Sequence, residues 1–300
     1  MKIFVTGGTG FIGRHLISRF LDEGFYVSTM ARKGSEHKLA QSKRLNIITG
    51  DITESHSLEG ILSGVNIVIH LTGILREFVK DGITFEKAHF NSLLNTASEA
   101  KKNGVSRFIF VSAEGASPGS FVKYLRSKFI CEEYLKTFGF DYTIIRAPLV
   151  YGPYDRATAN FINLVRKSSF IPLIGTKDAK ISPLFVDDLI TAIIALVKDG
   201  NVGCGTFDMK GKDLISYREM ITIIANIMNK KIHFFSIPFG AVKITTRLLE
   251  NFRNYPLCYD QILMMEEKLE KGEDFSKYIN IQPTTYCDGV RKTIEIMGIL

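Results

Sequence analysis

Tyr124 and Lys128 lie four positions apart in the hexapeptide KYLRSK (123–128). On a helix this spacing places both side chains on one face, one turn apart. A phenol has an ordinary pKa of about 10, so it needs a neighbouring cation before it can work as a phenolate near neutral pH. The pair therefore predicts proton transfer beside a redox cofactor. The alternative is an ordinary solvated helix face.

A glycine-rich segment, VTGGTGFIGRHL (5–16), carries the strongest signal for such a cofactor. It follows a strand-like stretch and opens a helical pattern. Gly7 permits a tight turn, Gly10 lets the backbone approach a pyrophosphate, and Gly13 allows the helix to pack close to the sheet. The N-terminus of that helix offers N–H groups and a positive dipole end to phosphates. The segment predicts a dinucleotide site; the alternative is a set of glycines that only make the turn.

The end of the second strand-like stretch bears on the choice of cofactor. An NAD site usually places an acid there to accept from the ribose hydroxyls. Here the sequence is STMARKGSEHK (28–38), with Arg32 and Lys33 at the turn and no acid before Glu36. Two cations suit a 2′-phosphate, so NADP(H) is favoured over NAD(H). The alternative is that both are solvated turn residues.

Two further strand ends supply candidate contacts to the same cofactor. In TGDIT (49–53), Asp51 and the backbone of Ile52 are placed to meet the adenine. In HLTGI (70–74), the small pair Thr72 and Gly73 would let the backbone run along the cofactor.

Alternating strand and helix patterns over the first half predict a parallel, doubly wound α/β sheet. Each strand candidate is short, rich in β-branched or aromatic residues, and ends in turn or polar residues. The two clearest helical patterns, 84–104 and 120–139, both end on a glycine. The strand candidates are 2–6, 26–30, 45–49, 66–71, 107–112 and 142–146.

Beyond residue 150 the pattern changes to short strands mixed with longer helices, such as 216–230 and 284–298. We expect residues 1–150 to form a nucleotide-binding Rossmann domain, to which about 183–210 return. Residues 151–300 are expected to form a smaller, mixed substrate or lid domain.

Composition narrows the class of protein. The net charge of +7 is spread along the chain without a long basic run, which favours an anionic small ligand over nucleic acid. The longest apolar run, 189–197, is about half as long as a membrane span needs. No leader precedes the first strand-like stretch, so a cytoplasmic location is expected. Cys131, Cys204, Cys258 and Cys287 lack metal-binding spacing and are expected to be buried free thiols.

These motifs together resemble the short-chain dehydrogenase/reductase superfamily in its extended and atypical branches, over nearly the whole chain. They are TGGTGFIG (6–13), GDIT (50–53), HLTG (70–73), Asn91 in HFNSLLN, the pair Tyr124 and Lys128, RAPLVYGP (146–153) and VDDL (186–189). The resemblance implies hydride transfer to or from nicotinamide. Tyr124 would be the general acid/base, and Lys128 would tune it and hold the nicotinamide ribose.

The third catalytic member implied by the resemblance is a hydroxyl that orients the substrate carbonyl. Ser112 is the nearest match, although the extended enzymes place this hydroxyl one or two residues later, where this chain has Ala113 and Glu114. Ser117 and Ser120 are weaker candidates. The residues expected to contact the cofactor are Gly7, Thr9, Gly10, Phe11, Ile12, Gly13, Arg32, Lys33, Asp51, Ile52, Leu71, Thr72, Gly73, Asn91, Ser112, Lys128 and Pro148.

A closer resemblance is to the branch of the nucleotide-binding accessory subunit of respiratory complex I and its bacterial relatives. The segments HLTGILRE (70–77), GVSRFIFVSAEGASP (104–118) and RAPLVYGPYDR (146–156) carry it. Two functions follow. One is an NAD(P)-dependent oxidoreductase or epimerase acting on a small carbonyl or hydroxyl substrate, with nucleotide-linked compounds included. The other is a non-catalytic NADP(H)-binding protein that stabilises or regulates a respiratory-type assembly, with a protein partner.

The remaining polar and amphipathic features favour structural roles. His70 and His89 have no metal-spaced partner and are expected to be structural. Asp187 and Asp188 are expected to cap a helix start. The amphipathic stretch FGAVKITTRLLENFR (239–253) is interpreted as a core-packed lid helix, which leaves peripheral contact with a membrane or protein as the alternative.

Overall fold

The computed structural model describes residues 1–175, 179–199, 203–253, 255–267 and 272–299. The chain divides into two compact units. Unit 1 comprises Met1–Ala147, Ile190–Met209 and Lys268–Asn280, and unit 2 comprises Pro148–Leu189, Lys210–Glu267 and Ile281–Leu300. Each is described separately below.

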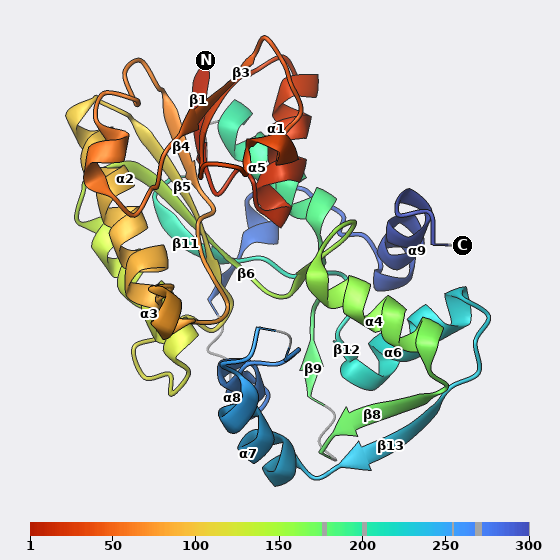
Figure 1. The fold of residues 1–300 in the computed structure, drawn as a ribbon. Coiled ribbons are helices and arrows are strands. Elements are labelled where there is room, and N and C mark those ends of the chain that lie inside the picture. Colours follow the sequence, from red (N-terminus) through yellow and green to blue (C-terminus); the bar gives the residue numbers. More distant parts are fainter. Residues whose placement is uncertain (176–178, 200–202, 254, 268–271, 300) are drawn as a thin grey trace. The chain divides into compact units, whose positions relative to one another are not determined.

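Unit 1 is built on one sheet of eight strands in the order β14-β11-β6-β5-β4-β1-β2-β3 (Figure 1). Every neighbouring pair in this sheet is parallel. The parallel, doubly wound sheet expected from the sequence is therefore confirmed, with two strands added at one edge. The strands are β1 (Lys2–Thr6), β2 (Tyr26–Ala31), β3 (Leu45–Thr49), β4 (Ile67–His70), β5 (Arg107–Ala113), β6 (Asp141–Ala147), β11 (Gly205–Asp208) and β14 (Glu273–Asp274).

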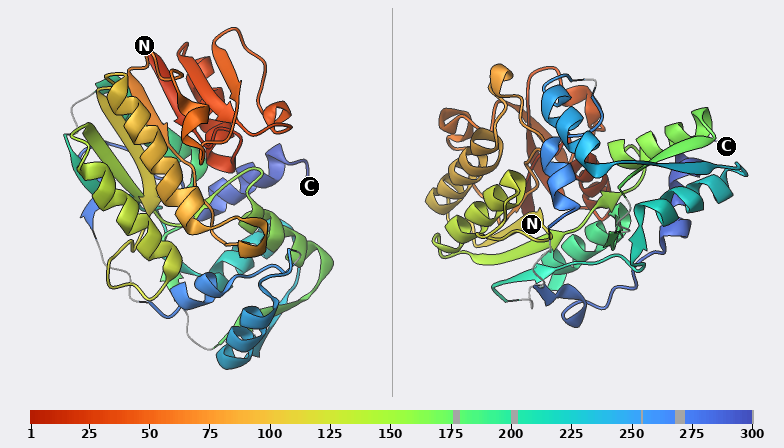
Figure 2. Two further views of the ribbon diagram at one scale, coloured as in Figure 1. Left: turned by 60° about the vertical axis from the view of Figure 1, so that its left-hand side comes forward. Right: turned by 90° about the horizontal axis from the view of Figure 1, so that it is seen from below.

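Helices cover both faces of this sheet. Figures 1 and 2 show α2 (Ser92–Lys102) and α3 (Lys123–Lys136) together on one face, and α1 (Phe11–Asp22) on the other. The part of α5 (Val186–Asp199) that belongs to unit 1 lies on the α1 side. A π-helical turn, η4 (Glu86–Asn91), leads directly into α2. The short 3-10 turns of unit 1 are η1 (Glu36–Lys38), η2 (Ser55–Leu58), η3 (Val79–Asp81) and η5 (Phe275–Lys277).

The burial of the strands in the core of unit 1 explains why the sequence predicts them. All seven residues of β5 are buried, as expected for a central parallel strand covered on both faces. On the α2–α3 face, the aromatic side chains of Phe4, Phe108 and Phe110 pack with Leu93 and Leu135 in one cluster. This cluster holds the helix that carries Tyr124 and Lys128 against the sheet.

Unit 2 contains three two-stranded sheets and five helices among its described residues. The pairs β7–β10 and β8–β13 are parallel, and β9–β12 is antiparallel. The strands are β7 (Val150–Tyr151), β8 (Phe170–Ile174), β9 (Lys180–Ile181), β10 (Leu184–Phe185), β12 (Ile215–Ser216) and β13 (His233–Ile237). The helices are α4 (Arg156–Lys167), α6 (Tyr217–Ile227), α7 (Phe239–Leu249), α8 (Tyr259–Met264) and α9 (Tyr286–Ile296).

Side chains cap the N-termini of several helices of unit 2. Asp155 accepts from the Thr158 N–H at the start of α4, and Ser216 forms a capping box with Glu219 at the start of α6. Within the described part of the chain, every helix is too short or too polar to cross a bilayer.

Two smaller expectations can be compared with the structure. Asp187 and Asp188 lie in the first turn of α5, where acids complement the helix dipole as expected, and their carboxylates also hold the segment around α9. Asp188 accepts from the Thr284 N–H and hydroxyl at 2.8 and 2.9 Å, and Asp187 pairs with Lys292 at 2.5 Å. The four thiols are free as expected, but only Cys131 and Cys258 are buried, and Cys204 is exposed.

Candidate functional site

The glycine turn after β1 is closed by its own backbone. Gly7 has a φ of +69°, which favours glycine, and its carbonyl accepts from the Gly10 N–H at 2.9 Å. A Cβ on Gly13 would overlap the Gly7 carbonyl oxygen and the Gly8 Cα. A Cβ on Gly8 would overlap the Thr29 hydroxyl. These positions therefore exclude side chains, and the turn presents backbone alone.

The start of α1 carries neither a side-chain cap nor an acid among the described residues. Gly10 is the N-cap residue in extended conformation. Thr9, Phe11 and Ile12 around it are partly exposed. The first N–H groups of a helix without a cap are available to a phosphate.

The turn after β2 places both expected cations at the surface. Arg32 and Lys33 are exposed, and the Arg32 carbonyl accepts from the Ser35 N–H at 2.8 Å. Glu36, the first acid after the strand, accepts from the Thr49 hydroxyl at 3.1 Å. Hydrogen bonds from nearby backbone N–H groups hold the pKa of Glu36 below its ordinary value. Its carboxylate is thus engaged with the end of β3.

The turn after β3 is fixed by an aspartate. One carboxylate oxygen of Asp51 accepts from both the N–H and the hydroxyl of Thr53 at 2.9 Å. The Ile52 side chain packs on the core, and its carbonyl accepts from the Asn95 amide at 3.2 Å. The adenine contact expected from this pair would therefore come from a rigid turn.

At the end of β4 a buried histidine orders the loop that follows. The Thr6 hydroxyl accepts from the N–H groups of Leu71 and Thr72 at 3.1 and 3.3 Å and lies 3.1 Å from Nδ1 of His70. Because both lone pairs of Thr6 are used, its proton goes to Nδ1 of His70. Burial lowers the pKa of His70 well below its ordinary value, so the ring is neutral. His70 has the structural role expected of it.

Thr72 and Gly73 lie next to each other in the loop after β4. The Thr72 hydroxyl oxygen is buried and has no hydrogen-bond partner among the described residues. A Cβ on Gly73 would lie 3.3 Å from Nε2 of His89 and 3.7 Å from Nζ of Lys128. The backbone of this loop therefore lies close to α3, next to the buried Thr72 hydroxyl.

His89 links this loop to α3 through a directed chain of hydrogen bonds. The Ile74 N–H donates to Nε2 of His89 at 2.9 Å, and Nδ1 lies 2.7 Å from the Ser127 hydroxyl. Ser127 donates its proton to the Tyr124 carbonyl at 2.6 Å, which suits a proton on Nδ1 of His89, and Nε2 also lies 3.0 Å from the Ile74 carbonyl. Burial, with a smaller effect of the Lys128 charge, lowers the pKa of His89 to about 3. The ring is thus neutral at physiological pH.

Tyr124 and Lys128 both lie on the sheet-facing side of α3. The Tyr124 ring is partly buried against Phe85 and His89, with ring centroids 6.1 and 5.8 Å away. The Lys128 ammonium is buried; it donates to the Val111 carbonyl at 3.0 Å and lies 4.5 Å from the Phe110 ring centre. The helix brings the pair to the end of the sheet where the loops after β1 and β4 begin.

The acidity of the pair differs from the sequence expectation. Burial raises the pKa of Tyr124 to about 12, whereas the neighbouring cation was expected to favour its phenolate. Burial likewise lowers the pKa of Lys128 to about 8. Desolvation is the largest cause of both shifts, and Tyr124 keeps its proton at neutral pH.

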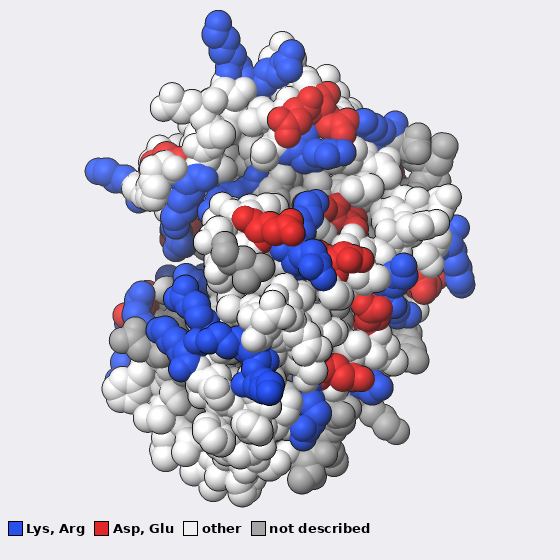
Figure 3. Space-filling view, turned by 90° about the vertical axis from the view of Figure 1, so that its right-hand side faces the viewer, with Lys and Arg blue, Asp and Glu red and all other residues white. Residues whose placement is uncertain are grey.

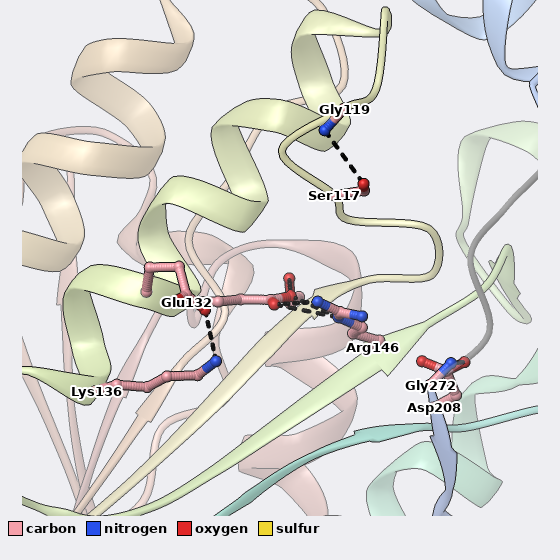
Figure 4. A network of polar contacts seen from close by, with 9 residues as sticks. Ser117, Gly119, Glu132, Lys136, Arg146, Asp208 and Gly272 are labelled. Carbon is pink, nitrogen blue, oxygen red and sulfur yellow. Dashed lines mark hydrogen bonds and ion pairs between the residues drawn. The ribbon is translucent and has the colours of Figure 1, made fainter.

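One turn further along α3, Glu132 engages Ser112. The fully buried Glu132 accepts from the Ser112 hydroxyl at 2.5 Å and from the Arg146 guanidinium at 2.6 to 3.1 Å (Figure 4). Ser112 and Arg146 are paired neighbours on β5 and β6. Tyr124, Lys128 and Glu132 therefore form one stripe at four-residue spacing, with a proton carrier, a cation and an anion in order.

The other predicted residues have local contacts of their own. The Ser117 hydroxyl accepts from the Gly119 N–H at 3.3 Å (Figure 4). Ser120 hydrogen-bonds the Val122 backbone. Asn91 ends the π-helical turn, and Pro148 is the first residue of unit 2.

Sequence reasoning missed the roles of His89 and Glu132. Glu132 lies four positions after Lys128, a spacing that marks it as a member of the same helix face. For His89 the sequence offers no comparable signal, because its partners, Ile74 and Ser127, are 15 and 38 positions away.

Comparison with known proteins places the site in a family. The model of the NAD dependent epimerase/dehydratase family matches residues 3–205. The chain is similar to the Arabidopsis thaliana protein named NADH dehydrogenase (ubiquinone) 1 alpha subcomplex subunit 9, mitochondrial. The two are 29% identical over 274 residues, which cover 88% of this chain and 67% of that protein.

Two further relatives are enzymes by name. The chain is 24% identical to the ceramide reductase of Caulobacter vibrioides over 79% of its length and 73% of that protein. Among solved structures, the UDP-glucose 4-epimerase of Thermotoga maritima has the same fold, with a TM-score of 0.78, 20% identity and coverage of 100% of this chain and 99% of that one. The match of the family model over two thirds of the sequence shows that the chain belongs to the NAD-dependent epimerase/dehydratase family.

Proposed function

We propose that this protein is an NADP(H)-dependent oxidoreductase or epimerase that acts on a small carbonyl or hydroxyl compound. The substrate classes we favour are those of the relatives, a nucleotide-linked sugar or the polar end of a lipid such as a ceramide. The observation that carries the proposal is the meeting of Gly73, Lys128 and the Tyr124 helix at the carboxyl end of the sheet. In open α/β sheets this end is where ligands bind.

The residues present fit a dinucleotide on two counts. The turn at Gly7, Gly8 and Gly13 has no room for side chains, which suits close approach by a pyrophosphate. The buried Thr72 hydroxyl lacks a partner that a ligand would provide. Arg32 and Lys33 would hold a 2′-phosphate, and Lys128 would hold the nicotinamide ribose.

When bound, the nicotinamide supplies or accepts the hydride. Tyr124, with its pKa raised to about 12, holds its proton at neutral pH and is an acid in the direction of reduction. Its hydroxyl would donate that proton to the substrate oxygen as the carbonyl carbon gains the hydride. The pKa of Lys128 is about 8, so its ammonium can lose a proton close to neutral pH. Such a proton would return to Tyr124 after the reaction.

Ser112 is proposed as the hydroxyl that orients the substrate carbonyl, with one requirement. Its proton goes to Glu132 in this structure, so catalysis would need that proton redirected to the substrate. The same observation favours a second candidate function, that of a protein that holds NADP(H) without turnover within a protein assembly. The respiratory subunits among the relatives point to the same alternative. A cytoplasmic location stays a prediction.

One experiment separates the two functions. The protein is purified, any co-purifying nucleotide is identified, and reduced nucleotide is incubated with a panel of carbonyl compounds while nicotinamide absorbance is followed. Turnover that falls at least about 100-fold in Tyr124→Phe, with cofactor affinity unchanged, would support the enzyme. Tyr134→Phe, a half-exposed tyrosine on the same helix, is the matched control. Tightly bound NADPH that no carbonyl oxidises would overturn the enzyme in favour of the second candidate.

Cofactor choice is tested separately with Arg32→Asp. Loss of one cation and gain of an anion should weaken NADPH binding at least about tenfold and leave NADH binding nearly unchanged. Lys43→Asp makes the same charge change at an exposed residue before β3, at the opposite end of the sheet. Equal effects of Arg32→Asp on both nucleotides would remove the basis for NADP(H).

A further inference from the structure

The β8–β13 pair in unit 2 has one apolar face turned to solvent. Side chains alternate across a strand, and in β8 Ile171 and Leu173 are buried whereas Phe170 is 66% exposed. The partner strand repeats the pattern, because Phe235 pairs with Pro172 and is 47% exposed. The outward face of this small sheet is therefore aromatic where water would favour polar residues.

Helix α7 follows β13 and continues the exposed apolar surface. It buries only Val242 and Thr246, so it is not the core-packed lid helix expected from the sequence. Ile244, Leu248 and Phe252, at four-residue spacing, are 64%, 69% and 64% exposed. Leu249 adds a fourth exposed side chain at 40%. Four large apolar residues exposed within nine positions exceed the scattered exposure that needs no explanation.

The two chain segments that form this surface carry charged residues of one sign. The segments 156–175, which contains β8, and 220–249, which contains β13 and α7, hold seven Lys and Arg residues and no Asp or Glu. Figure 3 shows Lys and Arg side chains gathered on one face next to a wide area without charged side chains. The seven are Arg156, Arg166, Lys167, Lys230, Lys231, Lys243 and Arg247.

The acids that do approach the surface are engaged in the fold. Glu250, which follows α7, accepts from the Tyr259 N–H at 2.8 Å. Glu266 pairs with Lys243 at 2.9 Å, and within the described residues the other six cations have no ion pair with an acid. Exposed apolar side chains bordered by cations match the two parts of an anionic lipid surface, its acyl boundary and its charged headgroups.

We propose that the outward face of β8, β13 and α7 binds the surface of a membrane that contains anionic lipid. The helix lies in the interface with Ile244 and Leu248 among the acyl chains and Arg247 at the headgroups, and Phe252 in the turn after the helix adds a third apolar side chain. A second copy of the chain is a poorer occupant, because pairing this face with itself would bring like charges together. This contact is peripheral and is consistent with the lack of a spanning helix among the described residues.

Vesicle co-sedimentation of the full chain tests the proposal. Wild-type protein should bind vesicles that contain phosphatidylglycerol at least about tenfold more tightly than vesicles of phosphatidylcholine alone, and added salt should weaken the binding. Leu248→Ser combined with Phe252→Ser should lower affinity by about tenfold or more, since both side chains lose apolar burial. Arg247→Ser should lower it by about fivefold, the effect of one cation at an anionic surface.

Leu214→Ser is the matched control, because Leu214 is a 62% exposed leucine of the same unit outside this surface. It should bind vesicles like wild type. Circular dichroism confirms that each variant is folded, as expected for substitutions at exposed positions. Absence of binding to anionic vesicles, or binding that the α7 substitutions leave unchanged, would overturn the proposal. Concentration-dependent dimers in ultracentrifugation that disappear in the Leu248 and Phe252 variant would assign the face to a second copy instead.

Discussion

The two halves of the candidate site in unit 1 are built from different materials. At the start of α1, the turn at Gly7, Gly10 and Gly13 presents backbone, and its requirement is the absence of side chains. On α3, the stripe of Tyr124 and Lys128 presents buried ionisable side chains whose pKa values move away from their ordinary ranges.

Because of this difference, the two halves of the site should respond to different kinds of substitution. We call the turn at Gly7, Gly10 and Gly13 the cradle. It is formed by backbone, so it leaves no space for an added side chain. The α3 stripe depends on partners that come from β5, β6 and the loop after β4. We therefore expect cradle mutations to act by volume and stripe mutations to act by charge and hydrogen bonding.

The largest effect is expected at the cradle. Gly13→Val would force side-chain atoms into the Gly7 carbonyl and the Gly8 backbone, which cannot yield as a flexible side chain could. We expect dinucleotide affinity to fall at least about 100-fold and stability to fall by about 3 kcal/mol or more. Calorimetry and thermal unfolding measure both. Gly240→Val, at a glycine with nothing within 4 Å of its Cβ position, is the control. Similar losses in both variants would contradict a volume effect.

The next effect is expected at the anionic end of the stripe. Glu132→Gln removes the charge that the Arg146 guanidinium and the Ser112 hydroxyl share in a buried site. Loss of one partner of a buried pair should lower unfolding free energy by about 3 kcal/mol in denaturant titration.

The adjacent residue provides the control for this prediction. Glu133 pairs with Lys136 at the surface, so Glu133→Gln should change stability by less than about 1 kcal/mol. Equal stability of the two variants would show that the Glu132 network contributes no more than a surface pair.

The contrast between cradle and stripe also explains what the sequence reveals. The strand predictions match closely, with 45–49 identical to β3 and 107–112 one residue short of β5. β5 is buried on both faces and so appears as a continuous apolar run between turn residues, whereas β3 is the edge strand and its residues are partly or fully exposed. The sequence predicts the cradle equally well, because the cradle depends on glycine at three positions.

What the sequence could not reveal depends on long-range contacts. β14 is two residues long and polar, so no periodic pattern marks it. The π-helical turn at Glu86–Asn91 looks like ordinary helix in the sequence, and it carries His89. The direction of the Tyr124 pKa shift also depends on how deeply the fold buries the ring, which residue spacing alone does not determine.

A third prediction separates binding from stability at Lys128. Lys128→Met should lower dinucleotide affinity at least about tenfold, through loss of a charged donor. The unliganded protein should not lose stability, because burial of the ammonium is costly and Phe110 offers the methionine an apolar contact.

The pH dependence checks the cause. The pKa of Lys128 is about 8 in the folded protein, below its ordinary value of 10.5, so between these values the unfolded chain binds more protons. Wild-type stability relative to Lys128→Met should therefore rise as pH increases from 8 to 10.5. A relative stability that stays flat over this range would mean that the ammonium is not desolvated.

The smallest effect is expected at His89, which joins the loop after β4 to α3. His89→Phe keeps the ring stacked on Phe85 but leaves the Ile74 N–H and the Ser127 hydroxyl without their partner. Loss of these hydrogen bonds should cost about 1 to 2 kcal/mol. His56→Phe, at an exposed histidine of the same unit, is the control and should change stability by less than about 0.5 kcal/mol.

NMR reports the protonation state of the His89 ring, which stability measurements do not show. Because burial holds the pKa of His89 near 3, its nitrogen NMR shifts should stay constant between pH 5 and 8 and report a proton on Nδ1. The folded pKa lies below the ordinary value of 6.5, so the stability that His89 contributes is present above 6.5 and lost as pH falls towards 3. The difference between wild type and His89→Phe should narrow over that range. A His89 signal that titrates near pH 6.5 would contradict the burial of the ring and the hydrogen bonds by which it joins the loop after β4 to α3.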